Sequence, residues 1–152
     1  MEVLTDAGNW GVVLVTMLAI SLIIGLHYEV LRNSLHFLPA VTRRRRQRVV
    51  ILILVILLTH AIEIWIFGVA YETLMHWDIF GVIKGDVPTT SVLDYVYFSA
   101  AVYSTVGFGD LVPHGPIRFM VGMEALTGLV MITWSASFTF LEMQRDWHNR
   151  VD

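Results

Sequence analysis

Cysteine is absent from this 152-residue sequence, and charged residues make up only 15% of it. Without cysteine, the chain has no disulfide framework and no cysteine-based metal site. The only basic run is short and lies between two apolar stretches, which argues against a nucleic-acid-binding domain. No complete set of catalytic side chains is visible, so an enzyme is the least favoured class. The length leaves room for one compact domain and for no large soluble one.

Long hydrophobic runs, in contrast, are abundant. Hydrophobic residues form 56% of the sequence and the mean hydropathy is +0.67, which is too apolar for a soluble domain of this size. Crossing a bilayer takes about 20 apolar residues. Three runs reach that length, at about 7–26, 49–71 and 117–141, whereas a fourth at about 92–104 is too short. We therefore predict an all-α membrane protein with three transmembrane helices. No Lys or Arg precedes the first run, so we expect a retained helix and not a signal peptide.

The positive charges gather between the first two apolar runs, at Arg43, Arg44, Arg45, Arg46 and Arg48. Loops rich in arginine stay in the cytoplasm, so this run orients the protein. We expect the N-terminus outside and the C-terminus in the cytoplasm of a multi-pass protein, in a plasma membrane or a cell inner membrane. The same arginines could also contact anionic membrane lipids.

A glycine-bearing stretch, Thr105-Val106-Gly107-Phe108-Gly109-Asp110, follows the short apolar run. Its glycines tolerate positive φ at little cost, which suits a backbone that must aim successive carbonyls at one axis. Ser91 and Asp94 fit a capping box, so we expect the short helix to begin at Val92. Non-helical backbone at membrane depth is tolerated only where it is buried in protein or lines a water-filled cavity. The pattern therefore indicates a pore.

This six-residue string resembles the selectivity filter of tetrameric potassium channels, whose TVGYG loop differs from it at one position. The resemblance covers about residues 49–143. It implies a re-entrant pore helix and filter between the second and third spans, and a homotetramer, because one loop cannot close a ring. It also implies that potassium binds the main-chain oxygens of Thr105, Val106, Gly107 and Phe108. Gly109 would complete the filter. No cofactor is expected.

The same resemblance divides the chain into three parts. Residues 1–42 would be an additional transmembrane helix with a cytoplasmic linker, 43–143 the pore domain, and 144–152 a short cytoplasmic tail. We expect the additional helix to pack at the periphery of the second span. His27 would lie near its inner end, in reach of the arginine run or of lipid headgroups.

Two carboxylates are expected to support the filter. Asp110 would lie just outside it, where it can accept a hydrogen bond behind the filter and raise the local cation concentration. Glu124 interrupts the third span, and we predict that it lies behind the filter, bonded to the pore helix. Phe108 replaces the commoner tyrosine of the family, so no phenol hydroxyl at that position tethers the filter to the pore helix.

The third span also holds the expected gating residues. Gly128 falls where relatives place a hinge glycine, although close helix packing explains it equally well. Ile132, Ala136 and Phe140 follow at helical spacing and would line the inner vestibule, with Phe140 as a dewetting constriction. The alternative for Phe140 is packing against the second span.

The second span contains Glu63, with His60 one turn before it. The two side chains can interact on one helix face, either to hold the span to its neighbours or for a function of their own. A zinc site is disfavoured because the second histidine of the usual helical motif is missing.

The leading functional hypothesis is a passive potassium-selective channel, with potassium ions, membrane lipids and further copies of the chain as its partners. A weakly selective cation channel is the alternative that Phe108 leaves open. A third possibility is a non-conducting pore-loop subunit that assembles with a partner. The sequence indicates no gating stimulus.

Overall fold

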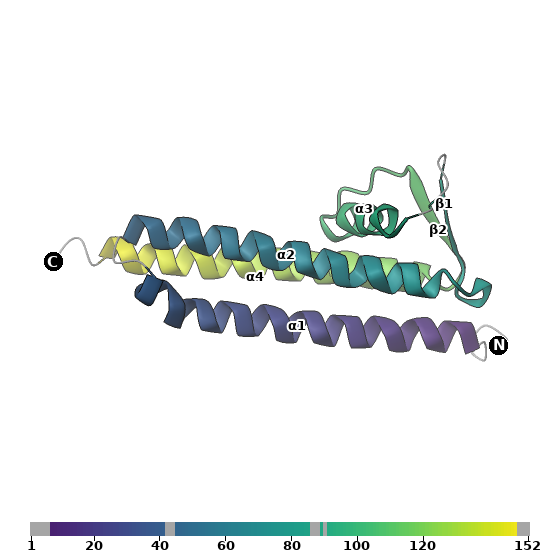
Figure 1. Cartoon of the computed structure of the whole chain (residues 1–152), viewed down its shortest axis with the longest axis horizontal. Coiled ribbons are helices and arrows are strands. Elements are labelled where there is room, and N and C mark those ends of the chain that lie inside the picture. Colours follow the sequence, from purple (N-terminus) through teal and green to yellow (C-terminus); the bar gives the residue numbers. More distant parts are fainter. Residues whose placement is uncertain (1–6, 42–44, 86–88, 90, 149–152) are drawn as a thin grey trace.

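The computed structural model describes residues 7–41, 45–85, 89 and 91–148. Three long helices run side by side: α1 (Ala7–Val41), α2 (Arg45–Leu74) and α4 (Arg118–His148). A short helix, α3 (Val92–Tyr103), packs against α2 and α4 on the side away from α1 (Figure 1). The three long helices are long and apolar enough to cross a membrane. The predicted all-α membrane fold with three spanning helices is confirmed.

The helix ends differ from the predicted spans mainly in α1. Hydropathy placed its end near residue 26, but the helix continues to Val41. The candidate membrane span within this helix also reaches further, to Ser34. Residues 27–37 contain no proline or glycine that would end a helix. Helix α4 likewise continues through residues 144–148, which the sequence assigned to a tail. The start of α3 is as predicted, with the Ser91 amide donating to Asp94 Oδ2 at 2.9 Å.

Helix α1 packs against both α2 and α4. Its buried residues recur every three or four positions and face both α2 and α4: Val12, Thr16, Ala19, Ile23, His27 and Leu31. The expected position at the periphery of the second span is therefore corrected, because the stripe fits into the groove between two helices. The expected place of His27 beside the arginine run or the headgroups is also wrong, since its side chain is fully buried.

Two short strands, which the sequence analysis did not predict, flank α3. Strand β1 (Val82–Gly85) precedes it and pairs antiparallel with β2 (Leu111–His114), which follows residue 110. The pairing brings the chain back to the place from which it left (Figure 1). Helix α3 and the residues up to 110 are thus part of an excursion that leaves from β1 and returns to β2. A 3-10 turn, Asp78–Phe80, leads into β1 and is linked to α4 by the Ile117 amide, which donates to the Phe80 carbonyl at 2.9 Å.

Both ends of the bundle are distinct. The N-terminal end of α1 lies against the 3-10 turn, at the end of the bundle that carries the strands, while the C-terminal end of α1, the start of α2 and the C-terminal end of α4 lie at the other (Figure 1). The start of α2 at Arg45 and the α3 excursion therefore lie towards opposite ends of the bundle. Arg43 and Arg44 lie outside the described residues; Arg45 and Arg46 begin α2, and Arg48 follows one turn later.

Candidate functional site: the glycine loop and its supports

Residues 105–110, here called the glycine loop, leave the end of α3 as non-helical backbone. Three of them have positive φ: Thr105 at 60°, Gly107 at 53° and Gly109 at 81°. A Cβ added at either glycine would meet no atom of this chain within 4 Å. Val106 and Phe108 are 56% and 68% exposed. The loop thus has the unusual dihedrals expected of it, and its outer surface is not covered by its own chain.

The first residues of the glycine loop are bonded to the last turn of α3. The Thr105 amide donates to the Val102 carbonyl at 2.9 Å, and the Gly107 amide donates to the Ala101 carbonyl at 3.0 Å. These bonds use main-chain acceptors that a helix end otherwise leaves unpaired. The position of α3 therefore sets the position of the loop.

The last residues of the glycine loop are held by Tyr97, in the middle of α3. Its hydroxyl donates to Asp110 Oδ2 at 2.8 Å, and its ring stacks on Phe108 with the planes 4° apart. The hydrogen bond to the Asp110 carboxylate raises the pKa of the Tyr97 hydroxyl above its usual value. The tether that Phe108 cannot supply is provided by a tyrosine eleven positions earlier.

Glu124 joins the three helices around the loop. Its carboxyl group lies 2.5 Å from the Tyr71 hydroxyl of α2 and 2.5 Å from Ser99 Oγ of α3. Ser99 Oγ also lies 2.9 Å from the Ile64 carbonyl. The contact with α3 is the one predicted from the sequence. Tyr71 and Ser99 bring two hydroxyl hydrogens to these three contacts, so all three are filled when Glu124 carries a proton of its own.

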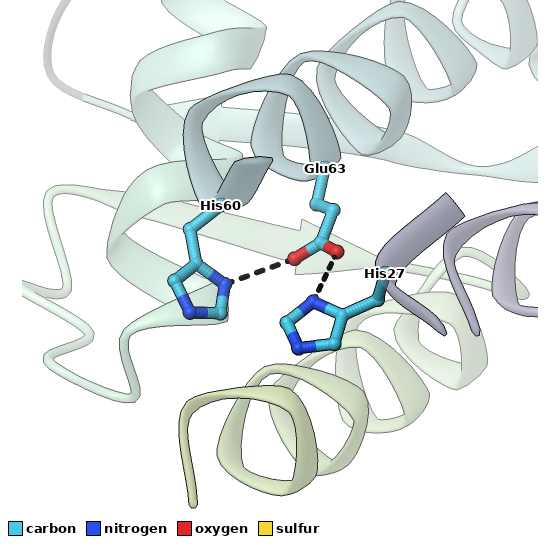
Figure 2. Close-up of side chains that lie close together, drawn as sticks. All are labelled: His27, His60 and Glu63. Atoms are coloured by element: carbon cyan, nitrogen blue, oxygen red, sulfur yellow. Dashed lines mark hydrogen bonds and ion pairs between the residues drawn. The ribbon is translucent and has the colours of Figure 1, made fainter. Parts of the chain in front are cut away.

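A second buried group, here called the histidine–glutamate cluster, consists of His27, His60, Glu63, Tyr103 and Ser135. Glu63 Oε1 bonds His27 Nδ1 at 2.8 Å, and Glu63 Oε2 bonds His60 Nδ1 at 2.9 Å (Figure 2). The Tyr103 hydroxyl donates to Glu63 Oε2 at 2.5 Å. Ser135 Oγ lies between the two histidines, 3.1 Å from His27 Nε2 and 3.2 Å from His60 Nε2.

The cluster ties all four helices together at one point, because α1, α2, α3 and α4 each contribute to it. The predicted interaction of His60 with Glu63 is present, and it does hold α2 to its neighbours. Sequence analysis missed the parts played by His27 and Ser135. The signal for His27 was its place four residues after Ile23 on the buried stripe of α1.

The same cluster has the residue types of a metal centre, since ligand atoms of His27, His60 and Glu63 lie within 4.8 Å of one another. Nitrogen and oxygen ligands of one zinc ion, each at about 2.0–2.1 Å, lie roughly 3.3 Å apart in a tetrahedral site. The N–O distances of 2.8 and 2.9 Å are shorter than that. The geometry therefore favours direct hydrogen bonds over a metal centre.

The expected gating residues fall into two groups. Gly128 is buried against the end of α3, where an added Cβ would collide with the Tyr103 carbonyl oxygen, so close packing gives this glycine a structural reason. Ile132, Ala136 and Phe140 are exposed on α4. Phe140 is 56% exposed, so it does not pack tightly against α2.

A family model described as ion channel matches residues 50–145, which is more than half of the chain. The matched stretch begins in α2 and ends in α4, so it includes α3, the glycine loop and both strands, whereas α1 lies outside it. No curated protein and no solved structure matches the sequence.

Proposed function

This chain belongs to the ion-channel family, and from that premise we propose that it conducts potassium selectively, as a homotetramer, through main-chain oxygens of the glycine loop. In this proposal the carbonyl oxygens of Thr105, Val106, Gly107 and Phe108 replace the hydration shell of the ion. The permeant ion is the cargo of the protein, and no covalent chemistry is involved.

The observation that supports the proposal is that the glycine loop is anchored to α3 while its surface is exposed. It is fixed at both ends to α3, it has positive φ at three positions, and its side chains Val106 and Phe108 are exposed. A loop that is anchored but uncovered is suited to meet equivalent loops of other copies. A ring of carbonyl oxygens needs such copies, because one chain supplies only one loop.

Orientation follows from the two ends of the bundle. Helix α2 begins at Arg45, at the end of the bundle away from α3, and arginine-rich loops remain in the cytoplasm. We therefore propose that the N-terminus and the glycine loop face outward and that the C-terminus is cytoplasmic. The arginines Arg43, Arg44, Arg45, Arg46 and Arg48 would then meet the anionic inner leaflet.

The exposed face of α4 is proposed to line the inner part of the pore. Ile132, Ala136 and Phe140 are exposed on this helix and follow Gly128, which packs on Tyr103, towards the C-terminal end. A ring of Phe140 side chains from four copies would form an apolar constriction that closes by dewetting. Gly128, which packs on Tyr103, would set the distance between α4 and the pore helix.

Ion flux into liposomes that contain only the purified chain tests the proposal. We expect potassium flux to exceed sodium flux by at least about 100-fold, because fixed carbonyl rings coordinate the two ions differently. Comparable potassium and sodium fluxes would favour the weakly selective channel. Absence of flux from correctly inserted protein would favour a non-conducting subunit.

A further inference from the structure

We propose that the histidine–glutamate cluster is a proton-binding site that couples α1 to the glycine loop. With both histidines neutral and Glu63 ionised, the cluster would lack one of the hydrogens that its contacts need. In our proposal the cluster binds one additional proton relative to that state. The binding of this proton is independent of the function proposed above, whereas its effect on conduction rests on that function.

The proton count follows from the contacts. Five contacts each need a hydrogen: Glu63 with His27, with His60 and with Tyr103, and Ser135 with each of the two histidines. A neutral imidazole, a serine and a tyrosine each donate one hydrogen, and an ionised carboxylate donates none. The group therefore brings four hydrogens to five contacts. A sixth contact joins the Tyr103 hydroxyl to His60 Nδ1 at 3.0 Å. Both groups already bond Glu63 Oε2, so this contact needs no further hydrogen.

The hydroxyl of Ser135 is the critical member. It lies within hydrogen-bond distance of both Nε2 atoms, but it can donate its hydrogen to only one of them. When both Nδ1 atoms donate to Glu63, the other Nε2 must carry a hydrogen, which makes that ring an imidazolium. A protonated Glu63 satisfies the same five contacts with both rings neutral. The additional proton thus belongs to the cluster as a whole.

Charge favours the same state. The side chains of His27 and Glu63 are fully buried, and without the additional proton the cluster would carry one negative charge inside the bundle. An unpaired charge at that depth is unfavourable, and one bound proton makes the cluster neutral. The other acidic group near the cluster is Glu124 of α4. Its hydrogen-bond partners, Tyr71 of α2 and Ser99 of α3, are not members of the cluster. On the side of α4, Trp134 packs on His27 and has no ionisable group.

Tyr103 is the route from the cluster to the glycine loop. Its hydroxyl is bound by Glu63, its carbonyl oxygen packs on Gly128, and Thr105 follows two residues later. His60 is 14% exposed, whereas His27 and Glu63 are fully buried, so His60 is the ionisable member of the cluster nearest the surface of the chain. Loss of the proton leaves one contact without a hydrogen and an unbalanced charge beside Tyr103. We therefore expect potassium flux to fall about fivefold as the pH rises from about 6 to about 9.

Glu63→Gln separates the proton from the packing. A glutamine amide brings its own two hydrogens, so all five contacts are filled with neutral histidines and no additional proton. This variant should conduct potassium equally at about pH 6 and about pH 9. Glu142→Gln, the same substitution at a half-buried position near the C-terminal end of α4, should keep the wild-type pH dependence. A Glu63→Gln channel that retains the full pH dependence would overturn the coupling.

Spectroscopy of the wild-type chain tests the proton itself and needs no conduction. Nitrogen-15 spectra of the histidines together with infrared spectra of Glu63 should show either one imidazolium or a protonated carboxyl group at about pH 6. Two neutral rings beside an ionised Glu63 would overturn the proposal, as would a stoichiometric zinc ion that is lost in Glu63→Gln. If the chain does not conduct, the function above fails, and these spectra still decide the site.

Discussion

Replacing Gly109 by alanine should abolish potassium-selective flux, with a loss of at least about 100-fold. Gly109 has a φ of 81°, and a Cβ in the left-handed region costs roughly 1–2 kcal/mol. The proposed pore repeats that cost in four copies, which gives about 4–8 kcal/mol against the conducting arrangement, and each 1.4 kcal/mol corresponds to about tenfold. Because the added Cβ would meet no atom of its own chain, the effect would arise from the backbone. Potassium flux into liposomes measures it.

Gly25→Ala is the matched control for Gly109→Ala. Gly25 also has open space around its Cα, but it lies inside α1 with helical backbone. Alanine is favoured over glycine in a helix, so this variant should assemble and conduct as the wild type does. Undiminished potassium selectivity in Gly109→Ala would show that the glycine loop does not need its observed backbone.

Glu124→Leu should destabilise the folded protein by about 2–4 kcal/mol, whereas Glu124→Gln should change its stability by less than about 1 kcal/mol. Leucine leaves the buried Tyr71 hydroxyl without its acceptor and removes the link from α4 to Ser99. Glutamine reproduces the protonated carboxyl group, because its oxygen accepts from Tyr71 while its amide donates to Ser99. Thermal unfolding of the purified chain in detergent compares the variants.

Glu142→Gln again serves as the control for this pair. Glu142 lies on the same helix and bonds the exposed Arg145 at 2.9 Å, and exposed ion pairs contribute roughly 0–1 kcal/mol. Equal losses in Glu124→Leu and Glu124→Gln would contradict the count of hydrogens around Glu124, since they would indicate that an ionised carboxylate is required.

The parts of the fold that the sequence predicted are those with local signals. Each spanning helix needs about 20 apolar residues in succession, so hydropathy found all three. The capping pair Ser91 and Asp94 located the start of α3. The strands β1 and β2 gave no such signal, because each has four residues and they are paired across the whole excursion.

The histidine–glutamate cluster was harder to predict because it joins residues that are distant in the sequence. His27 bonds Glu63 across 36 positions and Ser135 across 108. No periodicity within one helix shows which side chain of another helix it will meet. The hydropathy of α1 indicated only a membrane span, and its histidine stood at the edge of that span. Burial of His27 between α2 and α4 connects α1 to α3 through Glu63, which also bonds Tyr103, and this connection was not expected from the sequence.

Electron cryomicroscopy of the full chain in lipid nanodiscs with potassium tests the central claim most directly. The account predicts four copies around one axis, with the carbonyl oxygens of Thr105, Val106, Gly107 and Phe108 facing that axis and ion density between them. Copies whose glycine loops point away from a shared axis, or lie outside the bilayer, would contradict it.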